Sequence, residues 1–344
     1  KNKNAVLKFL TSKKKAKTLN VEETSVPKID ILETNNRVPW SGHMASYAIR
    51  DIYQKIKKSS LTIVFVNTRA QAELVFNKLW QENENNLRIA IHHGSLEKEI
   101  RRKVESLMSS GKIDCVVATS SLDLGIDWGD VDLVVQIGSP KGISRFLQRI
   151  GRSNHRFDEP SNALLVPSNR FEYLECLSAI NSIKNKLLDE TKEKQGSLDV
   201  LAQHILGVAC SEPFQVDELY NQVINAWPYR NLTKIKFFEV LEFVKNGGYS
   251  LKHYEQYSKI GVNKDKFYAI KNKSVRNRYR LNVGTIVESY MLKVKLGNRT
   301  LGQVEEWFIE GLNEGDTFLF SGRVLEYQSI SNNNVIVRST SHTQ

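Results

Sequence analysis

The chain has 344 residues, which is too long for one typical domain and suits two or three. Its 49 lysines and arginines exceed its 38 aspartates and glutamates, giving a formal net charge of +11 at pH 7. This charge favours a polyanionic partner, most often nucleic acid, and the alternative is a merely basic surface. No apolar run approaches the ~18 residues that a membrane span needs, so a membrane partner is not expected.

Cysteine usage indicates a reduced intracellular protein. Cys115, Cys176 and Cys210 lie far apart in apolar surroundings, with no CxxC pair and no Cys/His metal spacing. We therefore expect buried thiols, no metal site and a cytoplasmic location. Near the start, AVLKFL is short and interrupted by Lys8, so it is not the core of a signal peptide.

The first 40 residues are lysine-rich and weakly patterned, and are interpreted as a tail or a connection. From residue 44 strands alternate with helices, and the strands are nearly continuous runs of Val, Ile and Leu. Such strands are buried on both faces, which predicts a parallel sheet in an α/β domain over residues 30–194. Strands are expected at 61–66, 87–94, 113–120, 131–138 and 162–168, and helices at 44–58, 70–83, 96–111, 143–156 and 170–188.

The pattern changes after residue 194. Helices are expected at 197–209, 215–225 and 233–248, followed by two short strands around a turn at 263–266. Three helices and a hairpin predict a winged-helix domain over 195–272. Residues 273–344 are rich in strands and turns, and predict a small β-barrel or curled sheet.

Polar motifs follow the predicted strands, at the strand ends where open α/β sheets bind ligands. Hydroxyls, backbone N–H groups and a fixed guanidinium are the groups that phosphate oxygens require, although each short motif alone could be a capped turn. The residues concerned are Asn67, Thr68, Arg69, His93, Gly94, Thr119, Ser120, Gly125, Asp127, Ser139 and Lys141.

Two basic segments add candidate anion contacts. Arg145, Arg149, Arg152 and Arg156 have spacings of four, three and four, which predicts one helix face, and no acid occurs from 133 to 157. Further along, residues 271–280 place Arg276, Arg278, Tyr279 and Arg280 together. That segment is either a single-strand contact, with cations around a stacking ring, or a solvated linker.

The motifs IVFVNTRAQAE, VATSSLDLGID and QRIGRSNHR resemble motifs IV, V and VI of superfamily 2 helicases. The segments VPWSGHMA and SLDVLAQH resemble the large helicase-related (Lhr) branch in particular. The tail, from RLNVGTIVES to GDTFLFSGRVLE, is most similar to the ligase-associated DEXH-box group. The resemblance runs from about residue 37 to residue 330, and it implies a second RecA-like domain, a winged helix and an Lhr-type terminal domain over 273–344.

The resemblance implies roles for individual residues. Arg152 matches the arginine finger, Gln148 a glutamine near the nucleotide, and Arg149 a structural or phosphate-facing partner. Asp127 matches an acid that contacts the ribose, and Gly125 allows close approach. Thr119 and residues 67–69 match positions that hold the phosphates of the tracking strand. Many relatives carry an arginine where this chain has His155, and whether Arg156 supplies that contact to ATP is open.

The other half of a nucleotide site is absent from the sequence, which contains no GxxxxGK[ST] and no DExH motif. Residues 1–29 are interpreted as the connection from a first RecA-like domain of the same protein. We expect ATP and Mg²⁺ to act only in the full-length enzyme, and this chain alone to be inactive.

The resemblance implies that the parent is a 3′–5′ translocase on single-stranded DNA in bacterial DNA repair, with a DNA ligase and a nuclease as partners. Two alternatives stay open: a non-enzymatic strand-binding adaptor, or a helicase that acts on RNA or a hybrid.

Overall fold

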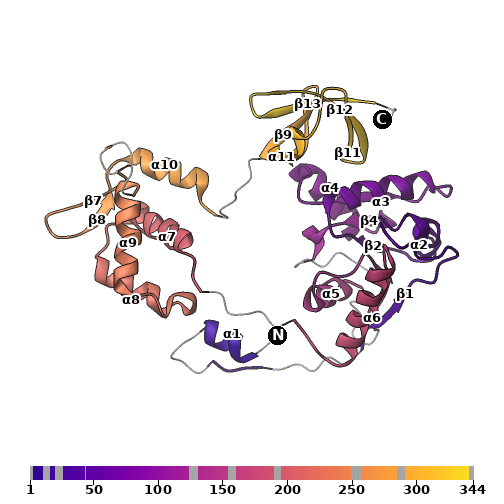
Figure 1. Cartoon of the computed structure of the whole chain (residues 1–344), viewed down its shortest axis with the longest axis horizontal. Helices are drawn as coiled ribbons and strands as arrows, with labels where there is room; N and C mark the ends of the chain where they lie inside the picture. Colours follow the sequence, from indigo (N-terminus) through magenta and orange to yellow (C-terminus); the bar gives the residue numbers. More distant parts are fainter. Residues whose placement is uncertain are drawn as a thin grey trace. The chain divides into compact units, whose positions relative to one another are not determined.

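A computed structural model gives the fold of the chain (Figure 1). It describes residues 3–10, 16–19, 26–42, 44–123, 131–153, 160–189, 195–248, 251, 254, 258–284 and 291–340. The chain divides into two compact units, which are treated separately below. The α/β unit comprises residues 21–189 and 289–344, and the winged-helix unit comprises residues 1–20 and 190–288.

The α/β unit is built on a six-stranded parallel sheet with the order β1-β6-β5-β2-β4-β3. Strands β2, β4 and β5 are buried along their whole length, as their unbroken apolar sequences predict. The strands are β1 (Lys28–Ile31), β2 (Thr62–Phe65), β3 (Ile89–His92), β4 (Cys115–Ala118), β5 (Leu133–Ile137) and β6 (Asn162–Val166).

Helices cover both faces of this sheet. Alternate residues of a strand point to opposite faces, so the apolar strands have two faces to bury. Val64 of β2 packs in the core beneath α2 and α3, whereas Ile63 and Phe65 pack in the core beneath α4, α5 and α6. The helices are α2 (Ile49–Ile56), α3 (Arg69–Gln81), α4 (Lys98–Ser109), α5 (Ile143–Ile150) and α6 (Arg170–Lys184), with 3-10 turns η1 (Ser46–Ala48) and η2 (Ser120–Leu122).

Strand β1 and helix α5 differ from the sequence-based expectation. Strand β1 was not predicted, because its four residues form too short a pattern within a lysine-rich stretch. Helix α5 ends at Ile150, where Gly151 is the C-cap, so Arg152 lies beyond the helix. The prediction that four arginines share one face of a continuous helix is therefore wrong for Arg152.

The winged-helix unit has the predicted three helices and hairpin, visible in Figure 1 around α9. Phe237 and Leu241 of α9 are fully buried in its core. At the hairpin turn, the Asn263 side chain accepts the N–H groups of Asp265 (3.1 Å) and Phe267 (2.8 Å). The elements are α1 (Lys3–Leu10), α7 (Leu198–Ser211), α8 (Val216–Asn225), η3 (Trp227–Tyr229), α9 (Lys234–Asn246), β7 (Ile260–Val262), β8 (Tyr268–Ile270) and α10 (Lys273–Asn282).

Helix α10 contains Arg276, Arg278 and Arg280, the basic residues that the sequence left as either a single-strand contact or part of a solvated linker. Asn272 caps it by accepting the N–H of Val275 at 3.2 Å. It clusters with the winged-helix unit, whereas the sequence placed residues from 273 onward in the terminal domain.

The terminal part of the chain forms a curled, five-stranded mixed sheet with the order β10-β9-β13-β12-β11, within the α/β unit. Its core includes Val294, Leu325 and Val335, all fully buried. Strand β13 lies at the centre, parallel to β9 and antiparallel to β12. The elements are β9 (Met291–Leu296), β10 (Arg299–Glu305), α11 (Glu306–Glu310), β11 (Thr317–Phe320), β12 (Arg323–Ser331) and β13 (Asn334–Ser339).

The three cysteines are unpaired and buried, as predicted. Burial raises the pKa of the Cys176 thiol to about 12. Among the helices that the structure describes, none combines the length and the apolar character needed to cross a membrane.

Candidate nucleotide and nucleic-acid site

The carboxyl ends of β5, β2, β4 and β3 form one edge of the parallel sheet, and the polar motifs lie along it. Beyond β2, the Asn67 side-chain amide donates to the Ser139 carbonyl beyond β5 at 3.0 Å. Beyond β4, the Thr119 N–H donates to the His92 carbonyl at the end of β3 at 3.2 Å. The first bond joins the loops after β2 and β5, and the second joins β4 to β3, so the described residues of these motifs lie along one edge of the sheet.

Thr68 begins α3 through a capping box. Its hydroxyl oxygen accepts the N–H of Gln71 at 3.2 Å, and the Gln71 side chain accepts the N–H groups of Asn67 (3.0 Å) and Thr68 (3.2 Å). The cap uses the hydroxyl only as an acceptor, so its O–H can still donate to an anion. The Thr68 and Ser120 side chains are exposed, and Thr119 is half-buried.

Arg69 contacts the terminal sheet, and His93 contacts both α3 and that sheet, where its ring centre lies 6.0 Å from that of Phe320. The Arg69 guanidinium lies 2.9 Å from the Glu305 carboxylate, and His93 is buried with its Nε2 3.0 Å from Glu73. Neither contact was expected from the sequence. That both residues touch nucleic acid stays a prediction, and for His93 it would require this buried contact to open. Gly94, in contrast, is exposed, with open space where a Cβ would lie.

His92 is buried at the end of β3, where it joins two elements. Its Nδ1 lies 2.7 Å from the Ser121 hydroxyl, and its Nε2 lies 3.1 Å from the Glu105 carboxylate of α4. Burial lowers the pKa of His92, and the hydrogen bond to Glu105 opposes this shift only in part. A neutral imidazole thus positions η2, which carries Ser120.

Arg149 is buried and fully occupied by neighbouring side chains. It donates to Asp123 at 2.8 Å and to Gln136 at 2.6 Å, and its guanidinium lies 4.8 Å from the centre of the Phe65 ring. Asp123 also lies 3.5 Å from the exposed Arg145. Of the two roles that the resemblance left open for Arg149, the structural one fits this geometry.

Acidic side chains from outside the arginine segment therefore lie beside it and offset part of its positive charge. Besides Asp123, Asp189 accepts the N–H of Ser144 at the start of α5 at 2.9 Å, and this bond lowers the pKa of Asp189. Sequence reasoning missed Asp123 and Gln136. The signal for Gln136 was present, since it is the one polar residue of the apolar strand LVVQI, where a buried amide needs a partner.

Arg152 lies in the turn that follows α5, half-buried. Its backbone N–H donates to the Arg149 carbonyl at 2.9 Å, and its Nε donates to the Gln148 carbonyl at 3.2 Å. Because no partner for Nη1 or Nη2 occurs within the described residues, the end of the guanidinium can meet an external anion. Gly125, Asp127 and Arg156 lie outside the described residues, as does His155.

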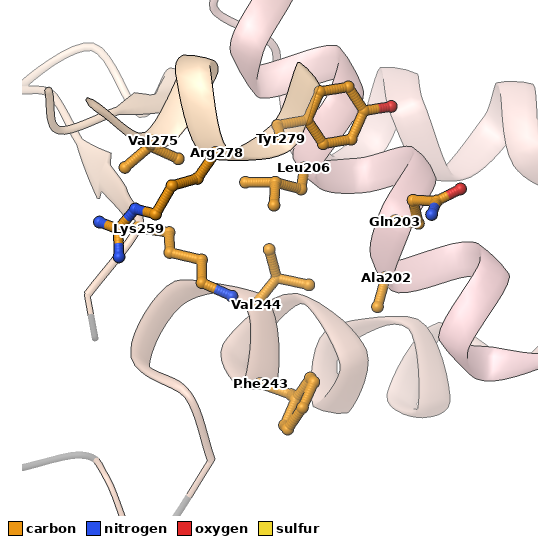
Figure 2. A pocket seen from close by; sticks show the side chains of 9 residues that line it. All are labelled: Ala202, Gln203, Leu206, Phe243, Val244, Lys259, Val275, Arg278 and Tyr279. Atoms are coloured by element: carbon orange, nitrogen blue, oxygen red, sulfur yellow. The ribbon is translucent and has the colours of Figure 1, made fainter. Parts of the chain in front are cut away.

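In the winged-helix unit, α10 does not present its three arginines together. Arg276 and Arg280 lie near Cys210 of α7, where their charges partly offset the effect of burial, which raises the pKa of that thiol. Arg278 is exposed and lines a cavity of about 470 Å³ between α7, α9 and α10, together with Tyr279 and Lys259. Figure 2 shows the two cations, Arg278 and Lys259, on the side opposite Ala202 and Gln203.

Metal ligands do not converge within the part of the chain that the structure describes. No group of three or more His, Cys, Asp or Glu side chains there could hold a metal ion.

Two family matches cover most of the chain. Residues 46–157 match the helicase conserved C-terminal domain, and residues 181–344 match the winged helix domain of the large helicase-related protein. The second match spans both the winged-helix unit and the terminal sheet. The structure therefore agrees with the predicted order of a RecA-like sheet, a winged helix and a curled sheet.

Individual relatives give the same result. The chain is 38% identical over 285 residues to the ATP-dependent helicase Lhr-Core protein 2 of Thermococcus barophilus, covering 82% of the chain and 33% of the relative. It is 31% identical to the Lhr helicase/uracil glycosylase of Escherichia coli, covering 72% of the chain and 16% of the relative. The chain thus spans about a third or less of the length of these relatives.

A solved structure also matches. The structure of Mycobacterium smegmatis helicase Lhr bound to ssDNA and AMP-PNP superposes with a TM-score of 0.71 and 26% identity, covering 84% of the chain and 38% of the other. A DUF1998 helicase, MrfA, bound to DNA shares the fold, with a TM-score of 0.65 at 17% identity.

Proposed function

Because this chain belongs to the large helicase-related (Lhr) family, we propose that it supplies the second half of an ATP-dependent helicase motor that translocates on single-stranded DNA. The observation that carries the proposal is Arg152, which a tight turn holds beyond α5, with no partner for the end of its guanidinium among the described residues. Arg152 acts as the arginine finger, neutralising charge that develops on the transferred phosphoryl group. Such a finger is typically worth ~10³–10⁵ in rate.

The neighbouring residues support the finger. The Gln148 carbonyl orients the Arg152 side chain, and buried Arg149 fixes the helix before it. Asp127 contacts the ribose, Gly125 allows close approach, and Arg156 completes the phosphate contact in place of the arginine that His155 replaces. The phosphate loop and the ligands for Mg²⁺ come from the first RecA-like domain of the full-length protein.

The single DNA strand binds along the edge of the parallel sheet. Thr68, Thr119 and Ser120 donate hydroxyl hydrogens to its phosphates, and Gly94 leaves room for the backbone to approach. The exposed Arg278 of α10 adds a cation. The Mycobacterium smegmatis helicase Lhr was solved bound to ssDNA and AMP-PNP, which supports both DNA and ATP as ligands of the motor.

Finer points of the proposal rest on the resemblance to the ligase-associated group. These are 3′–5′ polarity, DNA repair alongside a DNA ligase and a nuclease, and a bacterial cytoplasmic location. The similar relatives include archaeal as well as bacterial proteins. The competing functions are a non-enzymatic adaptor and an RNA helicase.

The first experiment measures ATP turnover by this chain with and without single-stranded DNA, and DNA affinity at two salt concentrations. We expect no turnover, and binding whose log K falls with log[salt] by about 0.7 per phosphate neutralised. DNA-stimulated turnover by this chain would contradict the assignment of the phosphate loop to another domain. A preference for RNA of the same length would favour the RNA helicase.

The finger is tested in the full-length protein by Arg152→Ala. We expect the DNA-stimulated ATPase rate to fall by ~10³-fold or more while DNA affinity is kept. Arg145→Ala is the matched control, because Arg145 belongs to the same segment but is exposed and faces Asp123. An unchanged rate for Arg152→Ala would show that the finger is another residue.

A further inference from the structure

The terminal sheet contacts the α/β domain along the edge strand β10. The Gln303 N–H donates to the Ser95 carbonyl at 2.8 Å, and the Glu97 N–H donates to the Leu301 carbonyl at 3.1 Å. Leu96 and Gly302 form an antiparallel bridge between these bonds. A Cβ at position 302 would collide with the Ser95 carbonyl oxygen, so glycine permits this approach of the two backbones.

The buried carboxylate of Glu73 accepts hydrogen bonds from the turn that joins β11 to β12. Ser321 and Gly322 both have positive φ, of 55° and 69°, which is the conformation of a two-residue type I′ turn. Both of their N–H groups donate to the Glu73 carboxylate of α3, from Gly322 at 2.7 Å. His93 lies 3.0 Å from the same carboxylate, and both side chains are 1% exposed. Glu73 therefore has three hydrogen-bond partners where no water reaches it, as a buried carboxylate requires.

One turn earlier on α3, Arg69 contacts the same sheet. Its guanidinium pairs with Glu305 at 2.9 Å and lies 5.1 Å from the centre of the Phe308 ring and 5.8 Å from that of Phe320. Residues four apart share one face of a helix, so Arg69 and Glu73 present a cation and an anion to the sheet side by side.

From these contacts we propose that Glu73 and Arg69 are docking residues that fasten the terminal sheet to the second RecA-like domain as one rigid body. The interaction partner of this helix face is thus a segment of the same chain, residues 299–323. The terminal sheet then moves with α5 and Arg152 whenever the motor domains open or close. This inference does not depend on the identity of the nucleic acid or on catalysis.

The test measures the distance between spin labels on the two parts of the whole chain, without DNA or nucleotide. Labels are placed at Lys103→Cys on α4 and Lys293→Cys on β9, where both native side chains are exposed. The native cysteines are buried, so labelling is selective. We expect one narrow distance distribution, which becomes broad with Glu73→Ala and with Arg69→Ala.

Two further variants make the result decisive. Gly302→Ala disturbs the contact from the sheet side, at an edge strand, and should broaden the distribution without unfolding either part. Glu326→Gln is the control, because it removes a carboxylate that pairs with Arg338 inside the terminal sheet, at 2.7 Å. It should leave the distribution narrow. Circular dichroism verifies that each variant is folded.

A broad distribution in the unmodified chain would overturn the inference. So would a narrow distribution in folded Glu73→Ala, Arg69→Ala and Gly302→Ala, because these contacts would then not be what holds the terminal sheet in place. Since no ligand is present in this measurement, its failure is distinct from failure of the proposed helicase function.

Discussion

At the scale of single residues, the arginines of the segment 145–156 are divided between two tasks. Arg149 is 3% exposed and is satisfied by Asp123 and Gln136, whereas Arg152 keeps the end of its guanidinium available within the described part of the chain. Both belong to the same short basic segment and lie only three residues apart. The difference arises because Arg149 belongs to α5 and Arg152 lies beyond its last turn.

Removing Arg149 should therefore weaken the fold. Arg149→Ala leaves the buried Asp123 carboxylate without its main partner, which costs about 3–5 kcal/mol of unfolding free energy. Urea unfolding followed by circular dichroism measures this loss. Arg145→Ala is the matched control: it faces the same carboxylate from an exposed position and should cost less than about 1 kcal/mol. Equal losses would contradict the buried role of Arg149.

His92 should make stability depend on pH. Its folded-state pKa is lowered from 6.5, so as pH falls below 6.5 the unfolded chain gains a proton that the folded chain resists. Stability is thus fully present above this pH and is lost on acidification. We expect His92→Gln to flatten the change in unfolding free energy between pH 7.5 and pH 5.5.

His204→Gln, at an exposed site on α7, should leave that pH dependence unchanged. If His92→Gln and the parent chain lost stability equally on acidification, the buried imidazole would not be the group responsible.

At the scale of elements, periodicity and caps predicted the strands and helices of the sheet correctly where the pattern was long. Helix α3 was expected from residue 70 and begins at Arg69, where the capping box at Thr68 sets its start. Short elements were missed, because β1 has only four residues and a strand of that length carries little pattern. For the candidate site, the sequence predicted that its polar residues lie in the loops that follow the strands. The partners of Arg69 and His93 could not be predicted, since only the fold brings Glu305 and Glu73 to them.

The attachment of helix α10 could not be predicted from the sequence either, because it depends on a contact between α10 and α7. The Tyr279 hydroxyl lies against Gly207 of α7, and a Cβ there would collide with it. Gly→Ala within a helix ordinarily gains up to ~1 kcal/mol. We predict the opposite sign for Gly207→Ala: a loss of stability and faster amide hydrogen exchange in residues 273–282.

Gly311→Ala provides the comparison, since a Cβ there would lie at an ordinary 3.6 Å from the Phe308 carbonyl. It should change exchange in α10 very little. Unaltered exchange in Gly207→Ala would mean that α10 is not held by this contact.

At the scale of the whole molecule, each of the two units has its own core. Leu241 is fully buried in the winged-helix unit, and Leu165 is fully buried in the α/β unit. Either Leu→Ala change should cost about 2–5 kcal/mol, since it leaves a cavity. Hydrogen exchange resolved by peptide should then rise in the unit that carries the change and stay the same in the other. A rise of similar size in both units would contradict separate cores.

The position of β13 has a consequence for how the chain is made. This strand lies between β9 and β12, so the terminal sheet lacks its centre until residues 334–339 have been synthesised and released from the ribosome. Strands β9 and β10 can form a hairpin earlier, but β11 and β12 have no route into the same sheet without β13. The α/β domain must therefore complete its parallel sheet first and wait for the terminal sheet. A nonsense mutation at residue 332 or 333 would leave two separate hairpins with exposed apolar faces, which is a form that proteases recognise.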